Sequence, residues 1–196
     1  MQLKTRVKVG NITNLSDARY CAGMGVDLLG FPIGDADGQI SFSTFQEIAE
    51  WVAGPEFIWE YADTMDEDGF QKVTQSGLIK HIQLDYNQLK RLHARLENLS
   101  VILKTSIDEW SDIYPHLSTH NISSLVLEEN KTPEWKKVKE INSSVQVLIP
   151  QQFIPDIDTV DSLPISGIVL EGSSEDKPGQ KDYDHLATVL ESLEVY

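Results

Sequence analysis

The sequence predicts an α/β fold, a closed (β/α)8 barrel with a parallel sheet, and three observations carry this prediction. Short runs rich in branched and aromatic residues alternate with helical stretches along the chain, and strict alternation of strand and helix is typical of a parallel sheet. Eight strand–helix units in 196 residues leave about 24 residues each, near the lower size limit of such barrels. The alternative, an open doubly wound sheet, lacks a Gly-x-Gly-x-x-Gly motif after its first strand.

Each predicted strand is short and is followed by a stretch with a helical pattern. The strands lie at residues 7–9, 28–33, 57–61, 81–84, 101–105, 124–127, 145–149 and 167–170. The helices lie at residues 15–24, 42–52, 67–76, 88–96, 108–114, 133–141, 156–162 and 183–193. Because the connections are short, we expect one domain over residues 1–196, with its function on the loops that follow the strands.

Capping residues support several of these boundaries. Asn14 precedes the first helix, Asp17 follows three residues later, and Gly25 lies just after the helix end. Thr-Pro-Glu at 132–134 predicts the start of a later helix, with proline at its first position.

Composition narrows the classes of function. Sixteen basic and 31 acidic side chains give an acidic protein with a net charge of -15, which repels nucleic acid and anionic lipid. No apolar run approaches the ~20 residues of a membrane span. We therefore expect a cytoplasmic protein that binds neither nucleic acid nor membranes. Cys21 is the single cysteine, which excludes an internal disulfide and a cysteine-based metal cluster. We expect no cofactor and no metal.

Both ends of the chain carry motifs of a known family. "VKVGNITNLSDARYCAGMGVDLLGF" at 7–31 resembles the start of phosphoribosylanthranilate isomerases, whose first strand reads Val-Lys-Ile-Cys-Gly-Ile-Thr-Asn. "GIVLEGSSEDKPGQKDYDHL" at 167–186 resembles their last strand and phosphate loop, and "HIQLDY" and "VILKTS" resemble strands between. The resemblance implies a TIM barrel with a small phosphorylated sugar-like ligand, and we expect a monomer or homodimer. The tail motif is carried here by Gly172, Glu175, Pro178, Gly179, Lys181 and Asp182.

The resemblance also implies a reaction, an Amadori rearrangement. In it a general acid helps to open the ribose ring and a general base removes a proton from the adjacent carbon. The family's base is the cysteine of the first strand, and this sequence has Gly10 there, with Asn11 in place of the following glycine. The family's acid is an aspartate after the sixth strand, where this sequence has the longer Glu128. A displacement of about 1 Å can lower a rate on the order of 100-fold.

Other positions that bind ligand in the family also differ. Gly38 aligns with the arginine that faces the anthranilate carboxylate, and Asp85 aligns with the histidine of the fourth strand. Gln151 and Gln152 align with paired glycines whose backbone amides approach phosphate. The half of the phosphate cradle that follows the last strand is therefore the half that matches the family.

The loop after the last predicted strand is the best candidate for binding a ligand. It can offer backbone amides and hydroxyls at the start of a short helix, a geometry that suits phosphate. The alternative is an ordinary surface turn. Together with the positions above, the expected ligand-binding residues are Lys8, Asn11, Gln83, Gln151, Gln152, Gly172, Ser173 and Ser174.

Lys8 is a charged residue inside the first predicted strand. Alternation places it on the same face as position 10, toward the barrel interior, where an unpaired ammonium is costly. It either helps to hold an anionic ligand or tune Glu128, or it closes an internal ion pair. Glu60 faces opposite to its aromatic neighbours in "FIWEY" and so points into the barrel mouth. The candidate partners of Lys8 are Glu60, Asp85, Glu128 and Glu171.

Two further residues and one histidine pair each have two possible interpretations. Glu128 serves as the general acid if the fold buries it, and otherwise it is a solvated loop residue. Cys21 is read as a core thiol of the first helix rather than a displaced base, because helix residues lie outside a barrel. His116 and His120 have the spacing of a metal pair, but Pro115 interrupts the helix and no third ligand is evident.

These observations lead to three hypotheses on function. The first is a divergent family member with weakened or lost isomerase activity, a pseudoenzyme in the extreme, that keeps a pocket for a small phosphate-bearing ligand. The second is an active phosphoribosylanthranilate isomerase of tryptophan biosynthesis, with Glu128 as acid and Asp85 or Glu60 in place of the cysteine. The third is a non-catalytic barrel for protein association. The first hypothesis is favoured by the family residues that this sequence lacks. These are the cysteine at Gly10, the arginine at Gly38 and the paired glycines at Gln151 and Gln152.

Overall fold

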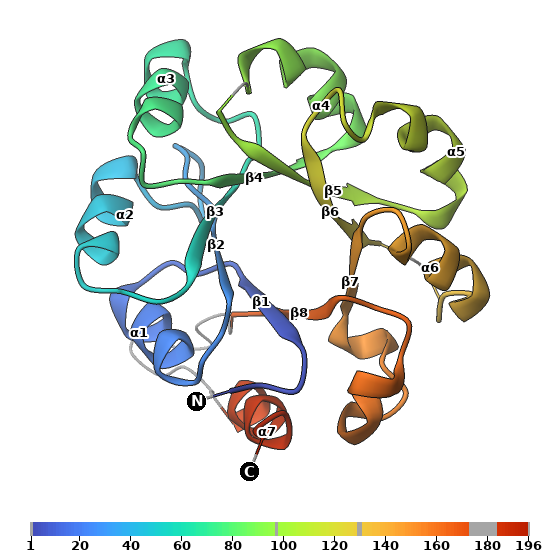
Figure 1. Ribbon diagram of the computed structural model, residues 1–196. Coiled ribbons are helices and arrows are strands. Elements are labelled where there is room, and N and C mark those ends of the chain that lie inside the picture. Colours follow the sequence, from blue (N-terminus) through green and yellow to red (C-terminus); the bar gives the residue numbers. More distant parts are fainter. Residues whose placement is uncertain (1, 97, 129–130, 173–183, 196) are drawn as a thin grey trace.

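The fold is a closed barrel of eight parallel strands in sequence order, as the sequence predicts (Figure 1). The structure is a computed structural model, and it describes residues 2–96, 98–128, 131–172 and 184–195. The open-sheet alternative is wrong, because the last strand pairs with the first and closes the ring. The strands are β1 (Arg6–Gly10), β2 (Leu28–Phe31), β3 (Glu56–Glu60), β4 (His81–Asp85), β5 (Ser100–Thr105), β6 (Ile122–Leu127), β7 (Gln146–Pro150) and β8 (Gly167–Glu171).

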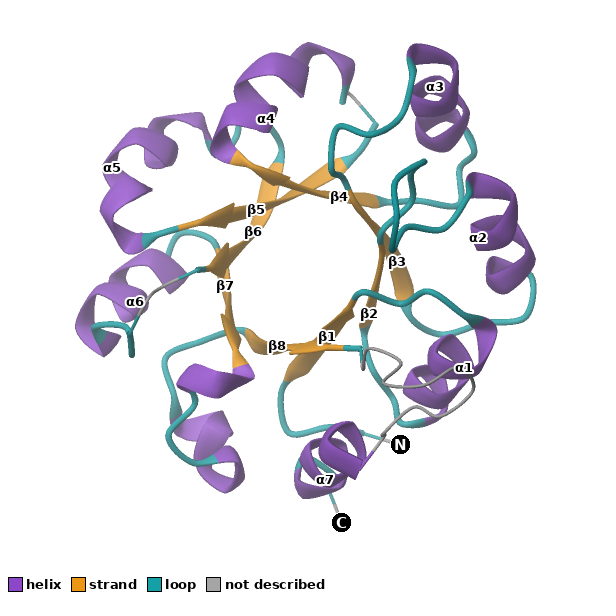
Figure 2. Ribbon diagram, turned by 180° about the vertical axis from the view of Figure 1, so that it is seen from behind, coloured by secondary structure: helices purple, strands orange, loops and turns teal. Residues whose placement is uncertain are grey.

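Helices surround the ring of strands (Figure 2). The two predicted helices at 88–96 and 108–114 are split into α and 3-10 segments, and the one at 156–162 is a 3-10 helix. Pro115, which cannot donate a backbone hydrogen bond, lies in one of these 3-10 segments. The α-helices are α1 (Leu15–Gly23), α2 (Phe42–Ala49), α3 (Glu67–Gln75), α4 (Tyr86–Leu92), α5 (Trp110–Ile113), α6 (Trp135–Asn142) and α7 (Asp184–Ser192). The 3-10 helices are η1 (His93–Arg95), η2 (Ile107–Glu109), η3 (Tyr114–His116), η4 (Gln151–Phe153) and η5 (Ile157–Ser162).

The cap of the first helix is confirmed and the predicted start of α6 is wrong. Asn14 accepts a hydrogen bond from the Asp17 backbone N–H, and Gly25 takes a left-handed φ of 79° just beyond the helix end. In α6 the predicted proline start fails, because the chain stays extended through Glu134 and the helix begins at Trp135.

A layer of apolar side chains fills the middle of the barrel. Successive side chains of a strand point to opposite faces, so every second residue faces inward. The next inward residues along the strands therefore reach the carboxyl-terminal mouth, among them Glu60, Lys104 and Glu171. The layer takes one residue from each of six strands, and none is more than 6% exposed: Leu28, Ile58, Ile102, Val126, Leu148 and Val169.

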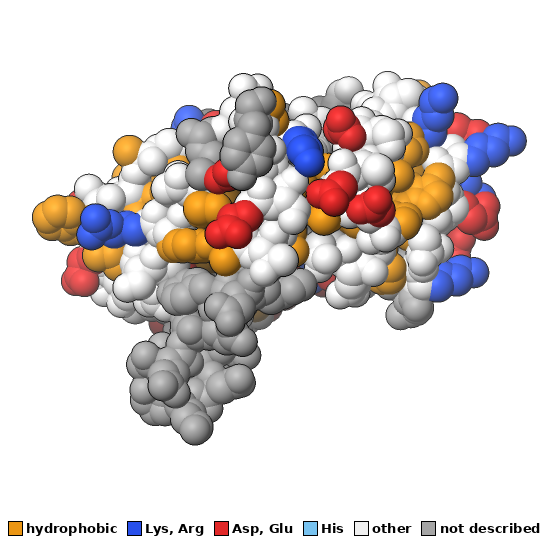
Figure 3. Space-filling model, turned by 90° about the horizontal axis from the view of Figure 1, so that it is seen from below, with side chains coloured by type: hydrophobic (Ala, Val, Ile, Leu, Met, Phe, Trp, Pro, Cys, Tyr) orange, Lys and Arg blue, Asp and Glu red, His pale blue; other side chains and the backbone are white. Residues whose placement is uncertain are grey.

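Charge on the surface agrees with the acidic composition. On the side of the molecule in Figure 3, acidic side chains lie around the middle and at both ends, and most lysine and arginine side chains lie toward the ends. This face therefore carries no continuous basic surface among its described side chains. Within the described part of the chain, no helix is both long enough and apolar enough to cross a membrane.

A polar network closes the amino-terminal end of the barrel. Glu56 Oε2 lies 3.0 Å from His81 Nε2 and 3.7 Å from Arg6 Nη2, and Glu56 Oε1 lies 3.3 Å from Lys80 Nζ. Arg6 also donates to Gln146 Oε1 at 2.6 Å. The hydrogen bond with His81 is the main cause that lowers the pKa of Glu56, and Lys80 adds to it.

We expect Glu56→Gln to lower the free energy of unfolding at pH 7, by less than about 1 kcal/mol because the pairs are partly exposed. A lowered pKa in the folded state gives stabilisation that is present above the ordinary glutamate value of about 4.3 and is lost as the pH falls through the folded value. Urea unfolding at pH 7 and below about pH 4.3 measures this difference, with exposed Glu50→Gln as the control. A difference of equal size at both pH values contradicts the expectation.

Candidate functional site

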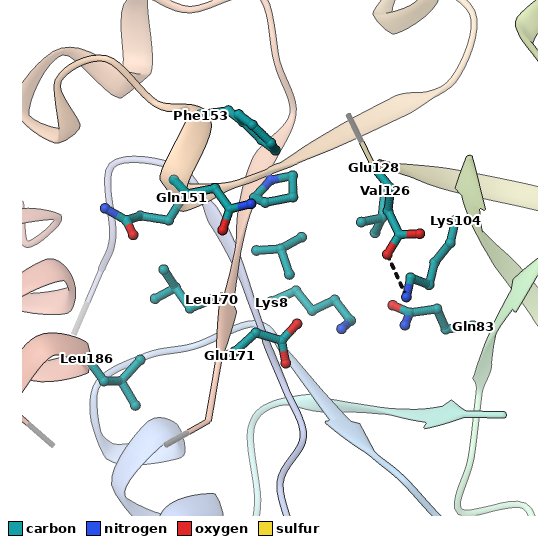
Figure 4. Close-up of a pocket in the computed structure, with 13 residues that line it drawn as sticks. Lys8, Gln83, Lys104, Val126, Glu128, Gln151, Phe153, Leu170, Glu171 and Leu186 are labelled. Carbon is teal, nitrogen blue, oxygen red and sulfur yellow. Dashed lines mark ion pairs between the residues drawn. The ribbon is translucent and has the colours of Figure 1, made fainter. Parts of the chain in front are cut away.

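A hollow at the carboxyl-terminal ends of the strands forms two adjoining lobes, which we call the first and second lobe of the mouth. The first lobe has a volume of about 430 Å³ and includes Lys8 and the η4 turn (Figure 4). The second has a volume of about 610 Å³ and includes Asn11 and Glu60. Ligands of (β/α)8 barrels bind at this end. Four residues line both lobes: Gln83, Lys104, Glu128 and Glu171.

Lys8 and Glu60 form an ion pair inside the barrel. The Lys8 side chain is 1% exposed, and its ammonium lies 2.6 Å from Glu60 Oε1. Glu60 Oε2 accepts a hydrogen bond from the Asn11 backbone N–H at 2.8 Å. Asn11 takes a left-handed φ of 55°, which asparagine tolerates better than most residues. The predicted internal ion pair is confirmed, and both oxygens of Glu60 are held.

The Glu60 carboxylate fills space that side chains at two glycines would occupy. A Cβ at Gly10 would lie 2.7 Å from Glu60 Oε1, 3.0 Å from Lys8 Nζ and 3.1 Å from Glu171 Oε2. A Cβ at Gly30 on β2 would overlap the same Glu60 oxygen. The place that the family resemblance gives to a cysteine base is therefore surrounded by two carboxyl groups and an ammonium.

Glu171 ends β8 and points toward Lys8 across the first lobe (Figure 4). Solvent reaches this side chain from the mouth, yet desolvation by the surrounding walls raises the pKa of its carboxyl. The Lys8 charge opposes this rise and the Glu60 charge adds to it. A raised pKa favours the protonated form that a general acid needs. The sequence identified Glu171 only as a partner for Lys8, because alternation predicts where a residue faces and not how far it is desolvated.

Glu128 lies at the rim of the mouth rather than inside it. Its side chain is 55% exposed, and Oε1 lies 2.6 Å from Lys104 Nζ (Figure 4). The burial on which its role as acid depends is absent. Sequence reasoning missed Lys104, although the signal was available: like Lys8, it is a lysine at an inward position of a strand.

Asp85 and Gln83 have different surroundings at the end of β4. Asp85 borders the second lobe, but its Oδ1 accepts a hydrogen bond from the Gln88 backbone N–H at 2.8 Å and caps α4. This bond gives it a structural task in place of a free base. Gln83 is 8% exposed, and its Oε1 has no hydrogen-bond partner among the described residues. An unpaired buried carbonyl oxygen is unfavourable until a donor reaches it.

The expected phosphate contacts are placed only in part. Gln151 and Gln152 lie in η4 and line the first lobe. The Gly172 amide donates to the Gly10 carbonyl at 2.8 Å, so this N–H already has a partner, and a role of Gly172 in binding a ligand stays a prediction. Two expected contacts lie outside the described residues: Ser173 and Ser174. The rest of the tail motif does too: Glu175, Pro178, Gly179, Lys181 and Asp182.

The remaining candidates do not line either lobe of the mouth. Gly38 lies in an exposed turn with a φ of 81°. Cys21 is buried on α1, as expected for a core thiol. His116 and His120 stack with ring centroids 5.2 Å apart, and His93 lies 4.8 Å from His120. Within the described ranges, no group of three His, Cys, Asp or Glu side chains is arranged to hold a metal ion.

The fold and the mouth define a class: a (β/α)8 barrel with titratable side chains gathered where barrel enzymes bind and convert their ligands. Comparison with known proteins narrows this class. No family model matches the chain. The N-(5'-phosphoribosyl)anthranilate isomerase of Petrotoga mobilis is 23% identical over 190 residues, which cover 90% of this chain and 91% of that protein.

Solved structures that are similar to the chain have the same name as this relative. The phosphoribosyl anthranilate isomerase of Thermus thermophilus has a TM-score of 0.70 at 19% identity, covering 96% of this chain and 98% of its own. A phosphoribosyl anthranilate isomerase in complex with reduced 1-(o-carboxyphenylamino)-1-deoxyribulose 5-phosphate has the same TM-score of 0.70, 19% identity and coverage of 96% and 98%. The chain is thus similar in sequence and in fold to phosphoribosylanthranilate isomerases.

Lys8→Met is expected to lower the free energy of unfolding by about 3 kcal/mol, because it leaves Glu60 without its cation in a largely buried position. The double variant Lys8→Met/Glu60→Met is expected to recover most of this loss. Denaturant unfolding measures both, with exposed Lys137→Met on α6 as the control. Equal losses in Lys8→Met and Lys137→Met contradict the expectation.

Glu171→Gln is expected to stabilise the protein at pH 7. A raised pKa in the folded state means that ionised Glu171 costs stability above its ordinary value of about 4.3, and that this cost disappears as the pH falls below that value. Thermal melting between pH 4 and pH 7 tests this sign, with Glu128→Gln as the matched rim variant. Destabilisation of Glu171→Gln at pH 7 contradicts the expectation.

Proposed function

We propose that this barrel binds a small sugar phosphate at its mouth and catalyses the Amadori rearrangement of its relatives at a reduced rate, with Glu60 in place of the missing cysteine. The observation that carries the proposal is the position of the Glu60 carboxylate, 2.7 Å from the point where a Cβ at Gly10 would lie. A glutamate is an effective base for removing a proton next to a carbonyl-type carbon, as in triosephosphate isomerase.

Two carboxyl groups, Glu60 at 2.7 Å and Glu171 at 3.1 Å from that point, divide the proton transfers. Glu171, whose pKa is raised by desolvation, gives its proton to the ring oxygen as the carbon–oxygen bond of the ribose ring breaks. Glu60 then takes the proton from the adjacent carbon and returns it to the former anomeric carbon. Glu171 recovers a proton from the hydroxyl that becomes the ketone, so both groups end as they began.

Two features support a reduced rate. The Glu60 carboxylate is held by Lys8 at 2.6 Å and by the Asn11 amide at 2.8 Å, and a base with two hydrogen-bond donors must give up part of this stabilisation to accept a proton. Glu60 also approaches from β3 rather than from β1, and a change in approach of about 1 Å can cost on the order of 100-fold in rate.

The ligand class follows from the relatives and from the size of the mouth. The ligand in one solved relative joins a carboxyphenylamino group to a ribulose phosphate, and lobes of about 430 and 610 Å³ accommodate ligands of that size. We extend the same proposal to a single domain over residues 1–196, a cytoplasmic location and a monomeric or homodimeric state.

Turnover of phosphoribosylanthranilate tests the proposal. We expect a rate about 100-fold below that of the Petrotoga mobilis relative, and a further loss of about 100-fold or more in Glu60→Gln, which keeps the shape but not the base. Exposed Glu47→Gln on α2 is the control. A folded Glu60→Gln variant with the wild-type rate contradicts the role of Glu60. Absence of turnover together with a stable protein partner favours the non-catalytic barrel.

A further inference from the structure

The two lysines of the mouth differ in how accessible they are to a ligand. Lys8 is 1% exposed and pairs with Glu60, which is itself 15% exposed. Lys104 is 38% exposed, lines both lobes, and has an ion pair only with Glu128 among the described residues. Among the described residues that line the two lobes, Lys104 is therefore the accessible cation for a ligand anion.

Glu128 is placed so that it can leave Lys104. Its backbone N–H donates to the Thr105 carbonyl at 2.8 Å, which fixes the backbone, while 55% of the side chain is exposed. Exposed ion pairs contribute little stability, so rotating this carboxylate into water costs little. Displacing Glu60 from Lys8 is different, because it leaves a buried ammonium without a partner.

Gln83 supplies the second half of the site. Like Lys104 it lines both lobes, it comes from β4, the strand that pairs with β5, and it is 8% exposed. Its Oε1 has no hydrogen-bond partner among the described residues. A carbonyl oxygen can only accept, so the group that satisfies it carries an N–H or an O–H.

We propose that Lys104 and Gln83 form an anion subsite, at which a ligand oxyanion displaces Glu128 from Lys104 while Gln83 Oε1 accepts a hydrogen bond from a neighbouring N–H or O–H of the ligand. A carboxylate beside an aromatic amine and a phosphate beside sugar hydroxyls both have this chemistry. In this subsite Lys104 on β5 and Gln83 on β4 bind the anion, because Gly38 has no side chain with which to bind it. This inference rests on the proposed function for the location of the ligand in the mouth, and it needs no turnover.

Two variants are therefore expected to change the affinity for the ligand in opposite directions. Glu128 and the ligand anion compete for one ammonium, so removing the Glu128 charge strengthens binding and removing the Lys104 charge weakens it. A general acid at Glu128 has a different signature, because Glu128→Gln then lowers turnover and leaves binding unchanged.

Isothermal titration of the full chain with anthranilate, benzoate and ribose 5-phosphate tests the subsite. We expect Glu128→Gln to bind at least one of anthranilate and ribose 5-phosphate about 3- to 10-fold more tightly, and Lys104→Met to bind it about 10-fold or more weakly. The compound that responds identifies the source of the oxyanion. If it is anthranilate, Gln83→Leu is expected to remove its preference over benzoate, which lacks the amine.

The matched controls are Glu134→Gln and Lys137→Met, which make the same charge changes in an exposed pair at the start of α6. Binding that is unchanged or weaker in Glu128→Gln overturns the subsite, as does equal binding in Lys104→Met and Lys137→Met. Because affinity is measured without turnover, an inactive protein that shows the expected affinities contradicts the proposed function and leaves the subsite in place.

Discussion

The ion pair between Lys8 and Glu60 is the interaction on which the mouth depends. A lysine with 1% of its side chain exposed requires a nearby anion, and the register of β1, β2 and β3 brings Glu60 to it across the β2 strand. Gly10 and Gly30 leave the room that this carboxylate fills. Charge and the absence of two side chains therefore combine to fix one carboxylate at the centre of the barrel end.

This arrangement separates the carboxyl groups of the mouth into different tasks. Glu171 is desolvated enough for its pKa to rise, whereas Glu128 stays at the rim beside Lys104 and Asp85 caps a helix. Environment decides these tasks, because three of the four acids are chemically identical glutamates. The burial and the neighbours of each carboxyl group therefore determine its role more than its residue type does.

The parts of this structure that repeat locally could be predicted from the sequence. Branched runs gave the strands, and alternation in "FIWEY" and around Lys8 placed Glu60 and Lys8 inside the barrel. Features that depend on closure could not be predicted. The choice of Glu60 among four acids, the desolvation of Glu171 and the bond between the Gly172 amide and Gly10 all arise where distant strands meet.

The close fit of Glu60 against the two glycines makes positions 10, 30 and 60 depend on one another. A Cβ at position 10 would lie 2.7 Å from Glu60 Oε1 and one at position 30 would overlap the same oxygen, so either side chain requires the carboxylate to move. Moving that carboxylate disturbs its ion pair with Lys8 and the hydrogen bond from the Asn11 amide. A substitution at either glycine therefore changes the charge balance of the barrel interior as well as its shape.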